Sequence, residues 1–255
     1  MLKIFNEDCF DTMNRIVHRG GSIGLILTSP PYNTGRKVVK ADKELYMKTY
    51  DVRYDVYTEH RNADEYTEWT IELFKMFDKV LSKNGCILYN MSYGNENPSQ
   101  MWLTMAAVIQ NTSFMIADTI IWKKSNALPN NMSHNKLTRI CEFVFVLCRK
   151  NEYKTFNANK SVTSLRPTGQ KMYENIQNFI EAKNNDGSCP LNKATYSSEL
   201  CEKLLKIYAQ PNTIVYDPFL GTGTTMVACK KLNLHCIGSE LSDKQCEWAK
   251  DRVGI

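Results

Sequence analysis

The sequence predicts an α/β protein built on one open, mostly parallel sheet. Short apolar runs with strand character alternate with helix-like segments along the chain, a pattern that places helices on both faces of such a sheet. Two of these runs, Ser22–Leu27 and Thr213–Asp217, pass directly into turns rich in proline, glycine and hydroxyl residues. Ligands bind beyond the carboxyl ends of strands in this fold class, so we expect both turns at one edge of the sheet.

The first half of the chain predicts several further elements in order. Leu2–Phe5 is a short strand, followed by an acidic turn that enters a helix. Apolar residues at helical spacing predict an amphipathic helix over 64–81, which the Lys83-Asn-Gly85 stretch should end. The remaining elements are the strand Cys86–Met91, a helix over 98–110, and the strands Met115–Trp122 and Thr138–Arg149.

In the last of these strands Glu142 stands in an apolar run, so its carboxylate must be partnered or sit at a wet end. The C-terminal part predicts helices over 194–208, 225–232 and 242–253, with the strand Asn233–Ser239 between the second and third. Ser and Glu residues near the first of these helices form an N-terminal cap signal.

Composition favours one soluble domain over residues 1–255. A chain of 255 residues with 43% hydrophobic content can bury a large core. No apolar run reaches the roughly 18 residues of a membrane span, and the first residues lack a secretory h-region, so we expect an intracellular, cytoplasmic protein with no membrane partner. The net charge of +5 is compatible with a polyanionic partner without identifying one.

The nine cysteines are scattered and never form a Cys-x-x-Cys pair. This arrangement predicts small, reduced core residues, with neither a disulfide framework nor a metal site.

The stretch Thr28-Ser-Pro-Pro-Tyr-Asn33 is a stiff polar turn. Each proline fixes its own φ and pushes the preceding residue toward extended geometry, and we expect the carbonyls of this turn to lack ladder partners. Free acceptors, a hydroxyl and an aromatic face are suited to holding a flat group that carries an amine, such as a nucleobase. The alternative is an ordinary turn that leaves the sheet.

A second motif, Tyr216-Asp-Pro-Phe-Leu-Gly-Thr-Gly-Thr-Thr225, joins a strand to a helix through glycines. Glycines in such a turn allow the backbone to approach a ligand. Glu240 then ends the next strand, in the place where an acidic residue usually accepts the ribose hydroxyls of a nucleotide ligand.

Together the two motifs resemble those of the DNA amino-methyltransferases, which transfer a methyl group from S-adenosylmethionine to an exocyclic base nitrogen. The catalytic motif precedes the cofactor motif, which resembles the β-class order. The resemblance implies a Rossmann-like class I methyltransferase fold with a circularly permuted motif order. The first strand and the strand before Glu240 should then be near neighbours.

The resemblance also implies the site residues and a double-stranded DNA substrate. The catalytic turn is Ser29, Pro30, Pro31 and Tyr32, in which Ser29 and the Pro30 carbonyl hold the amine and Tyr32 stacks on a flipped base. Asp8 could contact the cofactor adenine or simply cap the first helix. The implied cofactor residues are Asp8, Thr28, Thr195, Asp217, Phe219, Gly221, Gly223, Thr224, Thr225 and Glu240, with Tyr196 beside Thr195.

The target atom and the activity have alternatives. In the family, Ser-Pro-Pro-Tyr turns mostly accompany N4 of cytosine and Asp-Pro-Pro-Tyr turns mostly accompany N6 of adenine, so Ser29 favours cytosine, with adenine as the alternative. The chain has no Pro-Cys turn, which argues against methylation of a cytosine carbon. The other classes considered are an RNA or protein methyltransferase and a non-catalytic nucleic-acid-binding module. Relatives of this class are often homodimers.

Two polar segments are candidates for contact with DNA. The segment 35–65 interleaves basic and aromatic residues and predicts a DNA-contacting loop, with Arg36 and Lys37 as phosphate ligands; the alternative is a solvated loop. By family position, 150–192 should be a target-recognition insert, and the alternative is an ordinary surface insertion.

Overall fold

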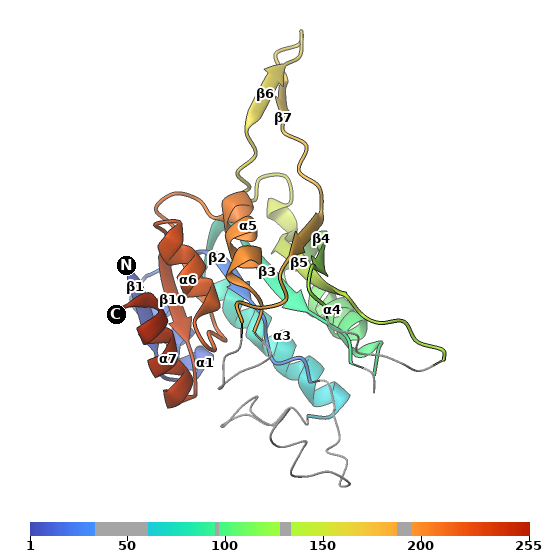
Figure 1. Cartoon of the computed structure of the whole chain (residues 1–255). Coiled ribbons are helices and arrows are strands. Elements are labelled where there is room, and N and C mark those ends of the chain that lie inside the picture. Colours follow the sequence, from blue (N-terminus) through green and yellow to red (C-terminus); the bar gives the residue numbers. More distant parts are fainter. Residues whose placement is uncertain (34–60, 95–96, 128–133, 188–194) are drawn as a thin grey trace.

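The computed structural model describes residues 1–33, 61–94, 97–127, 134–187 and 195–255, which form a layered α/β structure (Figure 1). An eight-stranded sheet runs through its centre. The strands are, in spatial order, β1 (Leu2–Phe5), β10 (His235–Ser239), β9 (Ile214–Asp217), β2 (Ile23–Thr28), β3 (Leu81–Met91), β5 (Cys141–Arg149), β4 (Phe114–Lys124) and β8 (Phe179–Ala182).

The sheet is mostly parallel, as predicted. The strands from β1 to β3 in this order are parallel, β5 is antiparallel to both of its neighbours, and β8 is parallel to β4. The expected adjacency of the first and last strands is also confirmed, because Leu2 lies opposite Cys236 and Phe5 opposite Ser239. The two ends of the chain therefore complete one continuous part of the sheet.

Helices cover both faces and enclose two apolar cores. The helices α1 (Cys9–His18), α3 (Ala63–Val80) and α4 (Gln100–Asn111) pack on one face, and α5 (Ser198–Tyr208), α6 (Thr224–Lys231) and α7 (Asp243–Val253) pack on the other. Side chains alternate across β2, so Leu25 and Leu27 enter the core under α5 to α7 while Ile26 enters the core under α1, α3 and α4. Each helix is thus held by the face that it buries.

The helix α3 begins with strong local signals and ends earlier than predicted. Asn62 and Glu65 form a reciprocal capping box at its start. It ends at Val80, and Leu81 is already extended, so the prediction that Lys83-Asn-Gly85 ends it was wrong. Asn84 instead has φ of 59° within β3, where it lets the strand deviate before it pairs regularly with β2.

The segment 150–192 contains strands that the sequence analysis did not predict. After the short 3-10 helix η2 (Lys150–Glu152) come β6 (Val162–Leu165) and β7 (Lys171–Tyr173), which form a separate antiparallel hairpin. The strand β8 then joins the main sheet with Ile180 and Ala182 buried. An edge strand of four residues is too short for an alternating pattern to identify it.

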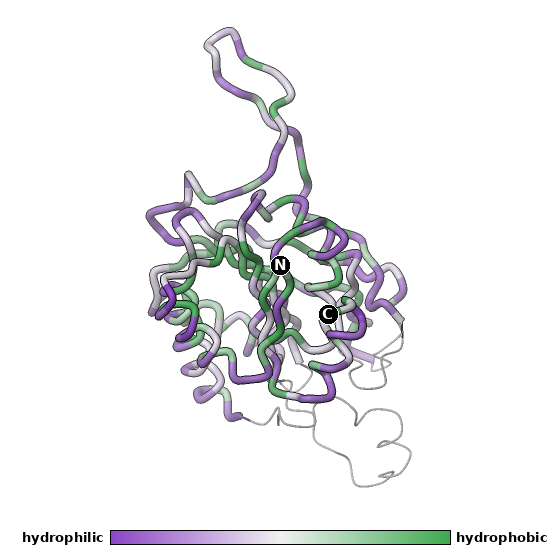
Figure 2. The backbone as a smooth tube through the Cα atoms, turned by 90° about the vertical axis from the view of Figure 1, so that its left-hand side faces the viewer, coloured by the Kyte–Doolittle hydropathy of each residue, from purple (hydrophilic) through white to green (hydrophobic). Residues whose placement is uncertain are grey.

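The hairpin projects far from the body of the molecule (Figures 1 and 2). Its base lies at the sheet edge where the parallel strands begin, because the backbone N–H of Asn157 donates to the carbonyl of Asn84 near the start of β3. The strands β2, β9 and β10 end at the opposite edge.

Neither metal ligation nor a membrane span is evident in the described parts of the chain. No three His, Cys, Asp or Glu side chains there form a group suited to a metal ion. None of the described helices combines the length and apolar character needed to cross a bilayer. The described cysteines are free thiols, and all except Cys141 are buried.

Candidate active site

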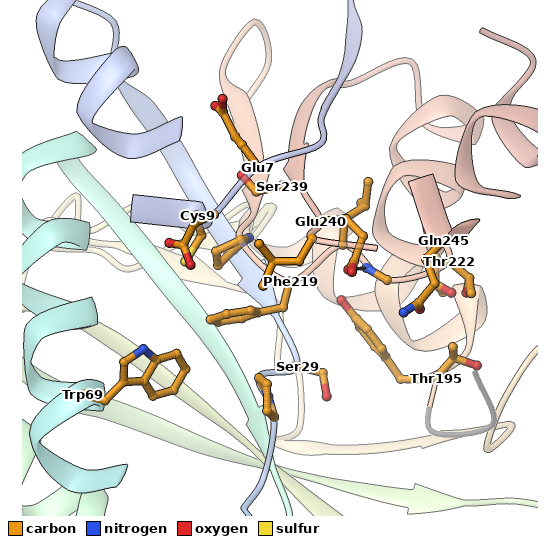
Figure 3. A pocket seen from close by; sticks show the side chains of 18 of the residues that line it. Glu7, Cys9, Ser29, Trp69, Thr195, Phe219, Thr222, Ser239, Glu240 and Gln245 are labelled. Carbon is orange, nitrogen blue, oxygen red and sulfur yellow. Dashed lines mark hydrogen bonds between the residues drawn. The ribbon is translucent and has the colours of Figure 1, made fainter. Parts of the chain in front are cut away.

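Four strand ends meet at one edge of the sheet around a cavity of about 190 Å³ (Figure 3). β2 ends at Thr28, β9 at Asp217, β10 at Ser239 and β1 at Phe5, and the residues that follow them line the cavity. The predicted site residues in its lining are Asp8, Ser29, Pro31, Thr195, Tyr196, Phe219, Gly221, Thr224 and Glu240. Residues of both sequence motifs therefore share one cavity.

Asp217 lies beneath this cavity and is fully buried. Its carboxylate accepts hydrogen bonds from the Thr28 hydroxyl at 2.7 Å, the Thr225 hydroxyl at 2.5 Å, the Tyr196 hydroxyl at 3.2 Å and the Phe219 backbone N–H at 3.1 Å. Thr28 and Thr225 are also fully buried. These three predicted cofactor residues therefore support the cavity floor and do not form its surface.

Burial raises the pKa of the Asp217 carboxyl, and its hydrogen bonds from Thr225, Thr28, Phe219 and Tyr196 oppose this shift. Burial also raises the pKa of the Tyr196 phenol, with the charge of Asp217 adding to the effect. The Asp217 carboxyl and the Tyr196 phenol are therefore two ionisable groups that the packing of the two motifs keeps out of water.

The turn between β9 and α6 needs its glycines. Gly221 and Gly223 have φ of 54° and 84°, in the left-handed region that residues with side chains rarely adopt. A Cβ on Gly223 would lie 2.8 Å from the Cβ of Ala249 on α7. The turn therefore brings backbone close to the cavity at the start of α6, where the first helical N–H groups have no intrahelical partners.

Glu240 follows β10 and reaches across to this turn. One carboxylate oxygen accepts from the Gly221 backbone N–H at 2.8 Å and the other accepts from the Ser242 backbone N–H at 2.9 Å. Burial raises the pKa of the Glu240 carboxyl, and these two hydrogen bonds oppose the shift. Because a carboxylate has about four acceptor positions, Glu240 keeps acceptor capacity for a ligand in the cavity.

Asp8 has the capping role that the sequence offered, and its position leaves contact with the cofactor adenine a prediction. Its carboxylate accepts from the Phe10 backbone N–H at 2.8 Å and caps α1, and the same residue lines the cavity. Glu7, which stands where the resemblance leads one to expect glycine, also lines the cavity and forms an ion pair with Arg15.

Sequence analysis missed an aromatic wall. Trp69 on α3 lies 5.7 Å from Phe219 between ring centroids, and the Arg61 guanidinium lies 4.8 Å from the Trp69 ring. All three line the cavity, and Figure 3 shows Trp69 and Phe219 on one side of it. The motif pointed to Phe219, whereas Trp69 fits the apolar pattern of α3 and could not be told from a core residue.

Other cavity residues were also outside the prediction. They lie next to predicted positions in the chain, or they come from the end of β10 and from the loop and helix beyond it. They are Cys9, Pro218, Leu220, Thr222, Ser239, Leu241 and Gln245.

The proline turn after β2 is held by hydrogen bonds from distant elements. The carbonyl of Pro31 accepts from the Tyr66 hydroxyl of α3 at 2.8 Å. This partner is a side chain and not a neighbouring strand, so the expectation of a free acceptor, and not that of a missing ladder partner, was wrong for this carbonyl. The Ser29 and Tyr32 hydroxyls are 2.8 Å apart, and Tyr32 donates to Glu142 on β5 at 3.0 Å. Pro30 is buried, while Ser29 is half-buried and lines the cavity.

A groove of about 470 Å³ lies at the same edge of the sheet. It is lined by residues that follow β3, including Tyr93, and by residues that precede or begin β5, including Lys136 and Arg139. The Arg139 guanidinium lies 4.5 Å from the centroid of the Tyr93 ring. Arg36 and Lys37, the predicted phosphate ligands, lie outside the described residues.

Comparison with known proteins adds similarities in sequence and in structure. A family model described as DNA methylase matches residues 23–251. The type II methyltransferase M.BglII of Bacillus subtilis is 25% identical over 267 aligned positions, which cover 97% of this chain and 67% of that protein.

Solved structures show the same fold. PvuII DNA methyltransferase, described as cytosine-N4-specific, superposes with a TM-score of 0.69 at 15% identity, covering 98% of this chain and 86% of that one. A complex of M1.HpyAVI with SAM superposes with a TM-score of 0.61 at 22% identity, covering 99% and 100% of the two chains.

The buried carboxyl of Asp217 predicts a measurable pH dependence. Because its pKa is raised by folding, its contribution to stability is full below the pKa of an unfolded aspartate, about 3.9, and is lost as the pH rises through the folded value. Asparagine does not titrate. The free energy of unfolding of the wild type minus that of Asp217→Asn should therefore fall as the pH rises above about 4, in urea titrations.

Asp243→Asn is the matched control, since Asp243 is exposed in the first turn of α7. A difference between wild type and Asp217→Asn that grows with pH would contradict the assignment of Asp217 as a buried, destabilised carboxylate.

Proposed function

The chain belongs to the N6/N4 DNA methylase family, and from this membership we propose that it transfers a methyl group from S-adenosylmethionine to an exocyclic amino group in double-stranded DNA. One observation carries the proposal. The glycine turn that is suited to a nucleotide-like cofactor and the Ser-Pro-Pro-Tyr turn that is suited to a base line the same cavity. Cofactor and target nitrogen would then meet without movement of either strand end.

The residues of the cavity fit S-adenosylmethionine. Each oxygen of the Glu240 carboxylate accepts one backbone N–H and can accept a further hydrogen bond, which suits a pair of ribose hydroxyls. The flat faces of Trp69 and Phe219 suit an aromatic base. The backbone N–H groups at the start of α6 suit a carboxylate. When bound, the cofactor supplies a methyl group made electrophilic by its sulfonium. The similar M1.HpyAVI chain, solved with SAM, supports the same choice.

The chain's own contribution is to hold the target amine. An exocyclic amino nitrogen is a poor nucleophile because its lone pair is delocalised into the ring. The Ser29 hydroxyl and the Pro30 carbonyl would accept its two hydrogens and favour a tetrahedral nitrogen, and the Tyr32 ring would stack on the base. Taking the base out of the duplex costs a few kcal/mol. Most of the rate would come from alignment of the nitrogen with the methyl group.

We further propose that the target is N4 of cytosine, with N6 of adenine as the alternative. Both amines neighbour a ring nitrogen that accepts hydrogen bonds, so acceptors alone do not choose between them. The neutral hydroxyl of Ser29, in the Ser-Pro-Pro-Tyr form of the turn, supports cytosine.

The DNA would approach the sheet edge that carries the cavity. The groove with Lys136 and Arg139 lies at that edge and is suited to phosphates. In the segment 150–192, the residues after β8 return to the same edge, where Asp186 accepts from the Ser198 backbone N–H. The role of this segment in target recognition stays a prediction. The β6–β7 hairpin projects from the opposite edge, so the residues after β8 are the part of the segment that lies where DNA would approach.

Methylation itself is tested with purified protein, S-adenosylmethionine and unmethylated duplex DNA, followed by mass spectrometry of the nucleosides. We expect N4-methylcytosine. Ser29→Ala should slow its formation by roughly 100-fold or more, because a positioned polar group at a reacting centre is lost. N6-methyladenine alone would reverse the choice of base and keep the enzyme class. Methyl transfer to RNA or protein in place of DNA, or no transfer at all, would reject the proposed function.

Glu240→Gln should weaken S-adenosylmethionine binding roughly 10- to 100-fold in calorimetry. The amide turns one donor toward a backbone N–H, either that of Gly221 or that of Ser242, and a hydrogen bond to a charged group contributes about 1.5–3 kcal/mol. Asp243→Asn, the same chemical change on the exposed start of α7, should bind like the wild type. Equal affinities in both variants would remove Glu240 from the cofactor site.

DNA affinity should fall steeply with salt, and Lys136→Gln should reduce the slope of log K against log salt by about one. Arg166→Gln removes one charge at the hairpin tip and should leave the slope unchanged, because the hairpin lies at the other edge. The opposite result would place DNA on the hairpin and would favour its role in recognition.

A further inference from the structure

A cluster of polar side chains lies behind the proline turn, where three strands of the sheet meet. Asn90 on β3 is fully buried, Glu142 on β5 is 9% exposed, and Lys124 ends β4. Glu142 accepts from Lys124 at 2.5 Å with one oxygen, and from Asn90 at 2.9 Å and Tyr32 at 3.0 Å with the other. The cluster therefore reaches the turn through the Tyr32 hydroxyl.

The charge of Glu142 decides the direction of the hydrogen bonds in this cluster. The Tyr32 hydroxyl has one hydrogen, and among the described residues two oxygens lie where they could receive it, Ser29 at 2.8 Å and Glu142 at 3.0 Å. A carboxylate accepts only, and hydrogen bonds to a charged acceptor are the stronger ones. The Tyr32 hydrogen therefore points to Glu142, so the contact between Tyr32 and Ser29 is made by the Ser29 hydrogen.

Asn90 supports the same direction. Its side-chain NH₂ donates to both Tyr32 and Glu142, so it supplies hydrogen to each and can take none from Tyr32. Its side-chain oxygen is buried and has no hydrogen-bond partner among the described residues. Leaving such an acceptor unsatisfied costs about 1–3 kcal/mol. The Asn90 side chain is thus held with its NH₂ group donating to Tyr32 and Glu142, while its own oxygen stays without a partner among the described residues.

We propose that Glu142 is a positioning residue for methyl transfer, which acts through Tyr32 to keep the Ser29 hydroxyl an acceptor. The proposal rests on the proposed function, because it concerns how Ser29 holds the target amine. With its hydrogen committed to Tyr32, the Ser29 oxygen can present only lone pairs to the cavity. It then accepts an amino hydrogen and cannot donate to the nitrogen lone pair, which must remain available to attack the methyl group.

Lys124 completes the arrangement by balancing the buried charge. Its ammonium contacts the carboxylate oxygen that does not face Tyr32, and it lies 5.1 Å from the centroid of the Trp122 ring. A buried carboxylate without such a partner would be strongly unfavourable. Lys124 therefore balances the charge of Glu142 on one oxygen and leaves the other oxygen to face Tyr32.

A double-mutant cycle of Tyr32→Phe and Glu142→Gln tests the proposal. Tyr32→Phe keeps the ring that would stack on a base and removes the hydroxyl. In Glu142→Gln, the amide oxygen is drawn to the Lys124 charge, so the NH₂ group turns to Tyr32 and the direction is reversed. We expect each single variant to lower the single-turnover rate of methyl transfer roughly 10- to 100-fold with unchanged affinity for S-adenosylmethionine. The double variant should be no more than about 3-fold slower than Tyr32→Phe.

Effects that multiply in the double variant would overturn the proposal, because Glu142 would then act independently of Tyr32. If Glu142→Gln does not fold, Tyr32→Phe still tests the proposal, because a full rate of methyl transfer in that variant would also overturn it. Tyr153→Phe, at the edge of the sheet opposite the cavity, is the control for loss of a tyrosine hydroxyl and should keep the wild-type rate. A wild type that methylates no DNA would reject the proposed function, whereas an additive cycle on an active wild type would reject only the role of Glu142.

Discussion

The hydrogen bond from Thr28 to Asp217 joins the two motifs on which the site depends. Thr28 ends β2 and leads into the proline turn, and Asp217 ends β9 and leads into the glycine turn. The bond is fully buried, where an unmade hydrogen bond is costly. Neighbouring parallel strands therefore end at the same level, and the two turns cannot move apart without exposing or orphaning a carboxylate.

The order of the motifs along the chain is less important than this junction. The strand β1 completes the sheet beside β10, although the two are at opposite ends of the sequence. Asn6, just after β1, donates to the carbonyls of Glu240 and Leu241, so the first loop and the last loop also support each other. The cavity is thus assembled around four parallel strand ends from both ends of the chain and from the turn after β2, and Trp69 of α3 and Thr195 before α5 complete its lining.

Sequence reasoning identified the parts of this site that carry their own local chemistry. Proline and glycine fix backbone geometry in Pro30, Pro31, Gly221 and Gly223, and such residues leave a readable pattern. Sequence reasoning could not separate residues that face the cavity from residues that support it. Asp217 at the end of β9 and Glu240 just after β10 are both acids at strand ends, and they differ only in what packs over them. Trp69 was hidden by the apolar pattern of α3. The partners of Glu142 were also beyond prediction, because the contacts of β5 with β3, β4 and the turn after β2 are set by sheet order.

The projecting β6–β7 hairpin has a consequence for how this architecture can diversify. Its strands pair with each other and with no strand of the main sheet, and it is rooted at the edge opposite the cavity. Changes in its length or composition would therefore leave the register of the sheet and the level of the strand ends untouched. Such a segment can vary freely during evolution and acquire new surface properties, while selection on the chemistry acts on a separate part of the molecule.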